Sequence, residues 1–111
     1  MNTPHERATP DALARLTHPD PRIRRIALRD LARATPLDQG ALAAVVESLA
    51  RESDTDARCL AASLLGKHAH EQARPLLASI LADPVTDALT AHHARVALDR
   101  IDIRNRPGWG G

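Results

Sequence analysis

The sequence has almost no aromatic residues. Its 111 residues include no Tyr and no Phe, and Trp109 is the single aromatic side chain. Aromatic and β-branched residues concentrate in sheets, whereas Ala and Leu, which recur along this chain, favour closely packed helices. The composition therefore indicates an all-α fold, and the length suits one domain.

Cysteine and an excess of charge of one sign are also lacking. Cys59 is the only cysteine, so no internal disulfide can form and nothing requires an oxidising compartment. The formal net charge is +1, whereas generic binders of nucleic acid or membrane surfaces usually carry a pronounced basic excess. No run approaches roughly 18 consecutive apolar residues, and Met1 to Asp11 lacks the apolar core of a signal peptide. We expect a soluble, cytoplasmic protein with no membrane partner.

The strongest feature of the sequence is an internal repeat. One Asp, one Ala and one Leu recur together at spacings of 34 and then 33 residues. The recurring sets are Asp20, Asp54 and Asp87; Ala27, Ala61 and Ala94; and Leu31, Leu65 and Leu98. Within each segment the Ala and Leu lie on one stripe of a helix, and in the first segment Ile23 and Ile26 are expected to join that stripe. These segments are predicted to be the second helices of three two-helix units that share one core.

Capping residues predict where the helices begin. The predicted starts are Thr9-Pro10, Thr35-Pro36, Ser53 with Asp56 as a capping box, and Thr86. Gly66 is expected near a helix end, and Pro75 must lie within the first turn of its helix. The expected helices are 10–17, 20–34, 37–51, 54–67, 72–82 and 86–102. They form one domain over residues 1–103, followed by a flexible tail of residues 104–111.

Three segments of the chain resemble HEAT repeats. They read DPRIRRIALRDLA, DTDARCLAASLLG and DALTAHHARVALD. The closest variety is that of phycobilisome chromophore lyase subunits and many short bacterial proteins, and the resemblance covers residues 9–102. It implies a short right-handed α-solenoid of about three two-helix repeats, with six helices. It also implies a ladder between units, formed by the acidic residue that opens each second helix and the Arg four positions later: Asp20 with Arg24, and Asp54 with Arg58. Because Ala91 replaces the third Arg, the ladder should end there.

The second helices also predict a binding surface. Four arginines line the predicted second helix of the first unit opposite its core stripe, and shifting them by the repeat period marks positions on the other two. The predicted partner-binding residues are Arg22, Arg25, Arg29, Arg33, Cys59, Ser63, Lys67, Leu89, His92, Val96 and Arg100. In this surface Arg33, Lys67 and Arg100 form a cationic row, and Leu89 and Val96 form an apolar end. An acidic or amphipathic protein segment would fit it.

The alternative is an ordinary solvated helix face. On that interpretation the arginines are partly neutralised within the chain, because Asp30 lies one turn from Arg33, and Glu47 and Glu52 lie on the neighbouring helix.

Metal binding and catalysis are not expected. His68 with His70, and His92 with His93, are the candidate ligands, but adjacent helical side chains point about 100° apart. No Cys or carboxylate stands at a recognised zinc-ligand spacing from them. Cys59 has no His partner nearby in sequence. We therefore expect no cofactor and no enzymatic activity.

Three functions remain open from the sequence. The first is a non-catalytic protein-interaction module or accessory subunit, with another protein as partner and self-association through an end of the solenoid as a further contact. The second, implied by the resemblance, is a subunit of a bilin lyase-like enzyme. The third is a weak nucleic-acid binder, because residues 1–34 carry seven Arg against four acids but residues 35–70 carry three basic residues against five acids. Trp109 either belongs to a frayed terminus, inserts into a partner or folds back over the last repeat.

Overall fold

The described part of the chain consists of helices joined by short loops. The computed structural model describes residues 4–34 and 36–106, and these contain six α-helices and one short 3₁₀ helix but no strand. The elements are α1 (Pro4–Arg15), α2 (Pro21–Arg33), α3 (Gln39–Arg51), α4 (Thr55–Lys67), η1 (Glu71–Ala73), α5 (Arg74–Ala82) and α6 (Ala88–Asn105). The predicted all-α fold is confirmed. None of these helices combines the length and apolar character that a membrane span requires.

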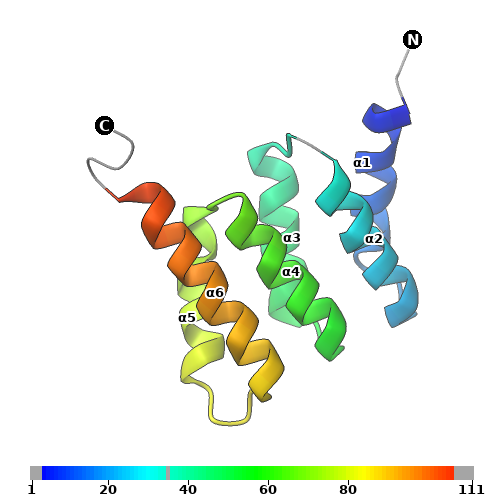
Figure 1. The fold of residues 1–111 in the computed structure, drawn as a ribbon. Coiled ribbons are helices and arrows are strands. Elements are labelled where there is room, and N and C mark those ends of the chain that lie inside the picture. The colour runs from blue at the N-terminus through cyan, green and yellow to red at the C-terminus, as the bar shows by residue number, and fades with distance from the viewer. Residues whose placement is uncertain (1–3, 35, 107–111) are drawn as a thin grey trace.

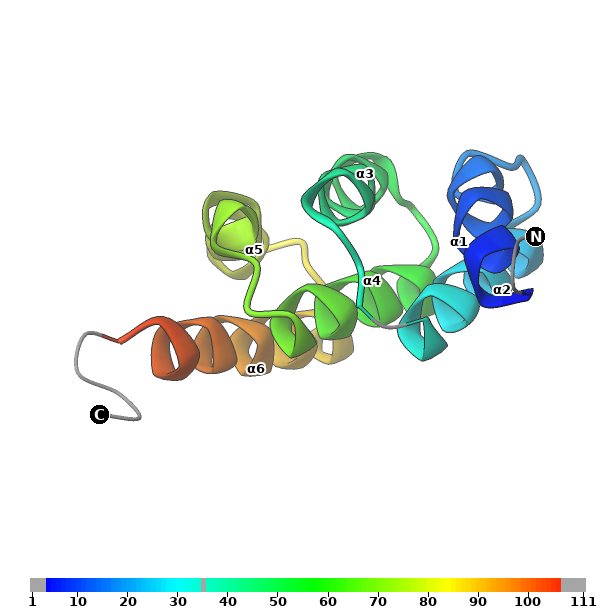
Figure 2. The same cartoon turned by 90° about the horizontal axis from the view of Figure 1, so that it is seen from above.

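The helices form two layers. Helices α1, α3 and α5 lie in one layer and α2, α4 and α6 in the other (Figures 1 and 2). The molecule measures 40 × 39 × 17 Å, and its smallest dimension is that of two helix layers. Helix α4 packs against α2 on one side and α6 on the other, so the predicted stacking of the second helices is confirmed.

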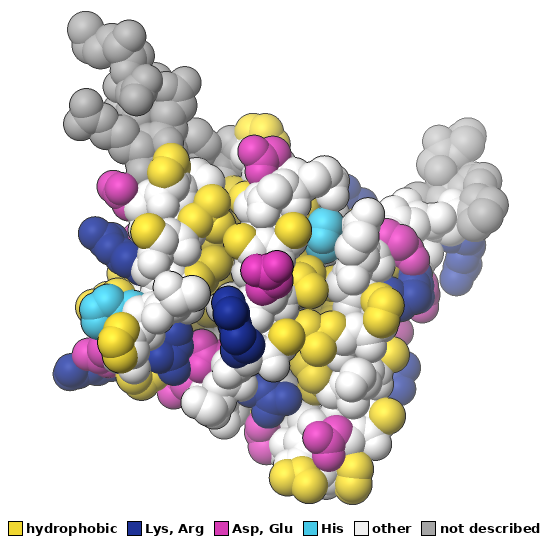
Figure 3. Space-filling view, turned by 180° about the vertical axis from the view of Figure 1, so that it is seen from behind, with side chains coloured by type: hydrophobic (Ala, Val, Ile, Leu, Met, Phe, Trp, Pro, Cys, Tyr) yellow, Lys and Arg dark blue, Asp and Glu magenta, His cyan; other side chains and the backbone are white. Residues whose placement is uncertain are grey.

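The two layers differ in how closely their helices approach. The second helices pack directly against one another, whereas α1 and α3 barely touch. Figure 3 views the layer of first helices, and apolar side chains are visible in the furrows between them. The stack therefore closes on the side of the second helices and opens on the side of the first helices.

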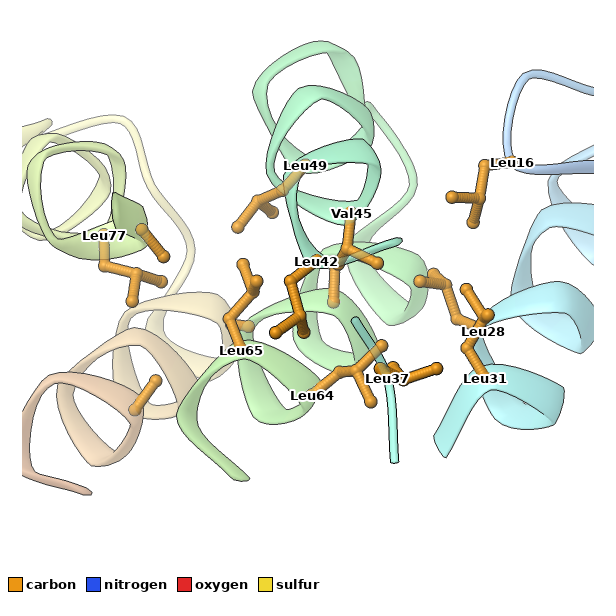
Figure 4. Close-up of a cluster of buried hydrophobic side chains, with 14 of the residues drawn as sticks. Leu16, Leu28, Leu31, Leu37, Leu42, Val45, Leu49, Leu64, Leu65 and Leu77 are labelled. Carbon is orange, nitrogen blue, oxygen red and sulfur yellow. The ribbon is translucent and has the colours of Figure 1, made fainter. Parts of the chain in front are cut away.

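The core lies between the layers. Figure 4 shows leucines of both layers pointing into this space, among them Leu42 of α3, Leu65 of α4 and Leu77 of α5. The recurring Ala and Leu positions are all buried there, with exposed fractions of 0–8%. Leu28 is buried as well, but Ile26 is 46% exposed, so its assignment to the core stripe was wrong. In α4 the equivalent residue, Leu60, packs against the core, whereas in the described chain nothing precedes the first unit to cover Ile26.

Aspartates cap the second helices and α3. The carboxylates of Asp20, Asp54 and Asp87 each accept a hydrogen bond from a backbone N–H two or three residues later, at 2.9 Å. These are the three repeated aspartates, so the repeat in the sequence reflects one capping interaction used three times. Asp38 caps α3 in the same way, with 2.7 Å to the N–H of Ala41.

Three of the predicted caps were therefore wrong. Ser53 and Asp56 flank the true cap Asp54, and Thr86 precedes Asp87 and instead donates its hydroxyl to the carbonyl of Ile80 at 2.8 Å. Pro36 precedes α3 without starting it, and Thr35 lies outside the described residues. In each case a carboxylate close by replaces the hydroxyl, and before α3 the shift also lets Leu37 be buried beside the core.

Helix boundaries differ from the prediction at three further places. Helix α1 begins at Pro4 and contains Pro10, so Thr9-Pro10 does not start it, and α6 continues to Asn105. The fifth helix is divided into η1 and α5, with Pro75 in the first turn of α5 as expected. Gly66 lies one residue before the end of α4, as predicted.

Gly66 lies at a close approach of α4 to α6. A Cβ atom on this residue would lie 2.7 Å from the Cα and 2.9 Å from the Cβ of Ala97. Real Cβ contacts of that length essentially do not occur, and one of the two atoms belongs to the backbone. The absence of a side chain at Gly66 therefore sets the distance between these helices.

We predict that Gly66→Ala destabilises the protein by about 1–3 kcal/mol, because the added methyl group forces α4 and α6 apart. The matched control is Gly40→Ala in the exposed first turn of α3, where the nearest atom to a new Cβ is 3.4 Å away. That change should be neutral or stabilise by up to about 1 kcal/mol through helix propensity. Urea unfolding followed by circular dichroism measures both, and equal effects would contradict the close-packing explanation.

Candidate functional site

Ion pairs between units determine which cations remain available for binding. Arg24 donates two hydrogen bonds to Glu52, at 2.8 and 2.9 Å, and two more to the carbonyls of His18 and Pro19. Burial raises the pKa of Glu52, but the hydrogen bonds from Arg24 and the backbone N–H groups of Asp54 and Ser53 outweigh it and hold the pKa below its usual value. This pair joins the loop before α2 to the loop before α4.

The ladder implied by the HEAT resemblance is present in altered form. The Arg58 guanidinium lies 4.0 Å from the Asp87 carboxylate of the next unit. In the first unit Arg24 contacts Glu52 instead of Asp54, and Arg25 takes its place, 3.4 Å from Asp54. Arg25 and Arg24 are therefore structural residues.

Three of the four predicted surface arginines form ion pairs within the chain. Arg25 also approaches Asp56 at 3.6 Å, and Arg22 binds the Asp20 carboxylate at 2.9 Å, which lowers the pKa of Asp20. Arg33 is 81% exposed in its side chain and lies 3.9 Å from Asp30. Arg29 has no ion-pair partner among the described residues.

A hollow over α4 brings four of the predicted residues together. We call it the Leu89 hollow; its volume is about 290 Å³ and it is lined by Arg29, Asp56, Cys59, Leu60, Ser63, Leu89 and His93. Leu89 is 51% exposed, whereas Cys59 is 7% exposed. Helices α2, α4 and α6 all contribute to it, so this hollow spans the three units.

A second hollow lies nearer the C-terminal ends of α4 and α6. We call it the Ile103 hollow; its volume is about 260 Å³ and it is lined by Gly66, Lys67, Arg100, Ile103 and Arg104. Lys67 also donates from Nζ to the carbonyl of Ala32 at 2.9 Å, which places the ends of α2 and α4 side by side. Three cationic side chains therefore surround an apolar residue, Ile103, that is 43% exposed.

The predicted surface is thus divided by the structure. Arg29, Cys59, Ser63 and Leu89 meet in one hollow, and Lys67 and Arg100 in the other. The remaining five predicted residues line neither hollow: Arg22, Arg25, Arg33, His92 and Val96. His92 is exposed on α6, one step along the helix from His93, whose ring it contacts edge-on at 5.6 Å.

Sequence reasoning missed several residues of both hollows. His93 is the counterpart of Leu60 in the repeat, just as His92 is the counterpart of Cys59. The position of Leu60 and His93 faces the preceding unit. Ile103 and Arg104 lie beyond the predicted end of α6 at residue 102. The sequence does contain a signal for Gly66, because a glycine inside a predicted helix indicates that a neighbouring helix approaches closely there.

The Leu89 hollow contains a pair of potentially reactive side chains. Ser63 Oγ and His93 Nδ1 share a hydrogen bond of 3.0 Å, and Cys59 Sγ lies 3.9 Å from Thr90 Oγ1. Burial raises the pKa of the Cys59 thiol. In the described part of the chain no hydrogen bond joins His93 to a carboxylate that would orient it as a general base.

A third hollow lies at the loop between α4 and η1. Its volume is about 770 Å³, and His68, His70, Arg74 and Asp102 are among the residues that line it. Three of its charged residues already bind one another, because Arg74 donates to Glu71 at 2.6 Å and also to Asp102. Among residues 4–34 and 36–106 no three His, Cys, Asp or Glu side chains form a metal-binding group.

Three stacked helical hairpins with adjacent second helices define an α-solenoid of two-helix repeats. The sequence pattern of HEAT repeats matches residues 4–101, and the chain belongs to the HEAT-repeat family. Such repeats are generally scaffolds for protein interaction. No match was found among curated proteins or among solved structures.

We predict that Glu52→Gln destabilises the protein by about 2–3 kcal/mol, because it removes the charge that Arg24 binds in a site where the Glu52 side chain is 2% exposed. Arg24→Gln combined with Glu52→Gln should cost less than the sum of the single changes. Arg22→Gln is the matched control, since that side chain is 78% exposed and its loss should change stability little. Additive costs in a double-mutant cycle would rule out coupling between the two side chains.

We predict that stability decreases between pH 7 and pH 5. Among the described residues, His68 Nε2 and His70 Nδ1 are buried and have no hydrogen-bond partner. Burial lowers the pKa of both histidines, and Lys67 and Arg104 add repulsion at His68. The pKa of a histidine in the unfolded chain is about 6.5. As the pH falls, the unfolded chain therefore takes up protons before the folded chain does, and the stability that is present above about pH 6.5 is lost as the pH falls through that value. The carboxylates with lowered pKa values respond only near and below their unfolded values of about 4. Melting temperatures across this pH range test the prediction, and an unchanged pH dependence in His68→Gln with His70→Gln would refute it.

Proposed function

We propose that this protein is a non-catalytic interaction module that binds an acidic, amphipathic segment of another protein on the face formed by α2, α4 and α6. The observation that carries the proposal is the distribution of charge around the two hollows. Arg29, Lys67, Arg100 and Arg104 line them, and in the described chain none of these four forms an ion pair with a carboxylate. Carboxylates of a partner would complement these cations.

The exposed apolar residues support the same face. Four large apolar side chains of the described chain are more than 40% exposed, and two of them, Leu89 and Ile103, line the two hollows. Apolar side chains surrounded by unpaired cations suit an amphipathic ligand better than a nucleic acid, whose backbone requires many phosphate contacts. A non-catalytic role is also consistent with the buried Cys59 thiol and with the missing carboxylate beside His93.

We predict that Arg29→Glu with Arg100→Glu reduces recovery of the bound protein about tenfold or more, because it reverses charge at both hollows. The matched control is Arg51→Glu with Arg95→Glu, which makes the same change in net charge at two exposed arginines that line neither hollow. Quantitative mass spectrometry of proteins recovered with wild-type and variant protein measures the difference.

Equal losses in the two double variants would contradict the proposed face, since net charge alone would explain them. A mobility-shift titration with duplex DNA at two salt concentrations provides the second check. If the protein binds DNA tightly at physiological salt and Arg29→Glu with Arg100→Glu abolishes that binding, the ligand of this face is a nucleic acid and not a protein.

A further inference from the structure

Residues of α4 and α6 line both hollows, and we call the strip of surface between these two helices, from one hollow to the other, the α4–α6 groove. This groove belongs to the layer that faces the viewer in Figure 1, where α4 and α6 run side by side. The residues that line the Leu89 hollow lie between positions 56 and 63 of α4 and between positions 89 and 93 of α6. Those that line the Ile103 hollow are residues 66 and 67 of α4 and lie between positions 100 and 104 of α6. A rise of 1.5 Å per residue separates the two hollows by about 10 Å along α4 and about 17 Å along α6.

That separation corresponds to two or three turns of an α-helix. Side chains at positions i and i+7 of a ligand helix are about 10 Å apart, and those at i and i+11 are about 17 Å apart, on the same side of the helix. An extended peptide would cover the same length with only three to five residues. The groove therefore suits a helix with two apolar side chains at one of these spacings.

The two ends of the groove differ in charge. Lys67, Arg100 and Arg104 surround the Ile103 hollow without a carboxylate among its lining residues. At the Leu89 hollow, Arg29 is accompanied by Asp56, whose side chain is 62% exposed. A ligand with acidic residues beside one of its two apolar side chains would have these carboxylates placed against the three cations.

We propose, building on the function proposed above, that the α4–α6 groove binds one amphipathic α-helix of the partner through two apolar side chains, two to three turns apart. One apolar side chain occupies the Leu89 hollow and the other occupies the Ile103 hollow, where the acidic end of the helix lies. Arg22 and Arg25, which the sequence predicts to be part of the surface, do not take part, because Asp20 and Asp54 bind them.

Synthetic helical peptides test this arrangement. The probes are fluorescein-labelled, alanine-based helices with Leu at i and i+7 or at i and i+11, and with Glu residues clustered beside one Leu. In the control peptide the second Leu is replaced by Ala. Fluorescence anisotropy should show that one of the two-Leu peptides binds the full chain at least about tenfold more tightly than the control, since one buried Leu contributes about that factor. Replacement of the Glu cluster by Gln should also weaken binding.

Variants of the protein locate the bound helix. Leu89→Asp and Ile103→Asp each change a side chain that is already 51% and 43% exposed, so the fold should tolerate them, and each should weaken the two-Leu peptide about tenfold or more. Val85→Asp is the matched control, because Val85 is 87% exposed in the loop before α6 and lines neither hollow; it should leave affinity unchanged.

The outcomes distinguish this inference from the function on which it rests. If all peptides bind equally, or if Leu89→Asp and Ile103→Asp have no effect while Arg29→Glu with Arg100→Glu still prevents recovery of a protein partner, the face is correct and the two-anchor helix is wrong. If the arginine variant has no effect on recovery either, the proposed function fails as well.

Discussion

The direct packing of α4 between α2 and α6 is the contact on which the remaining structure depends. A single helical hairpin of this length has no second apolar surface against which to bury its leucines, so each unit requires a neighbour. Gly66 permits a close contact between α4 and α6, because Ala97 occupies the space that a side chain would need. Because the second helices approach closely while α1 and α3 barely touch, their outer surface becomes one continuous face. The Leu89 hollow lies where α2, α4 and α6 meet, and the Ile103 hollow lies where α4 meets α6.

The same dependence on neighbours explains why equivalent positions behave differently at the two ends. Ala62 is fully buried and Gly66 is buried where α4 meets α6, whereas Arg95 and Asp99, one repeat later, are exposed on α6. Charged residues thus replace small ones where no helix of the described chain follows. At the other end of the stack, Asp30 of α2 replaces the leucine found at the equivalent position of α4. Ile26 of the same helix nevertheless stays exposed. The end beside α6 is therefore polar, and self-association through an end of the stack would favour the side of α2.

Features set by local interactions within each unit could be predicted from the sequence, and features set by neighbours could not. Asp54 and Leu65 have their repeated roles because capping and the helical stripe involve residues close in sequence. Ile26 was misplaced because its burial would require a preceding unit, and Ile103 was missed because α6 continues beyond its repeat. The hollows follow from where side chains of different units meet, and the spacing of one helix carries no information about that. The predicted arginine surface failed in part for the same reason, because the carboxylates that bind Arg25 lie on the next unit.

The charge gradient along the proposed groove follows from the parallel alignment of the second helices. A helix favours carboxylates in its first turn and cations in its last, because its N-terminal N–H groups and C-terminal carbonyls lack internal partners. Asp54 and Asp56 lie at the beginning of α4, and Arg25 reaches them from the first turns of α2. Farther along, α4 presents Leu60 and Ser63 instead of acids, and within the described part of the chain Arg29 forms no ion pair. Lys67 and Arg104 lie in the last turns of their helices. Parallel stacking therefore brings the acids and their paired arginines together at one end and the unpaired cations together at the other.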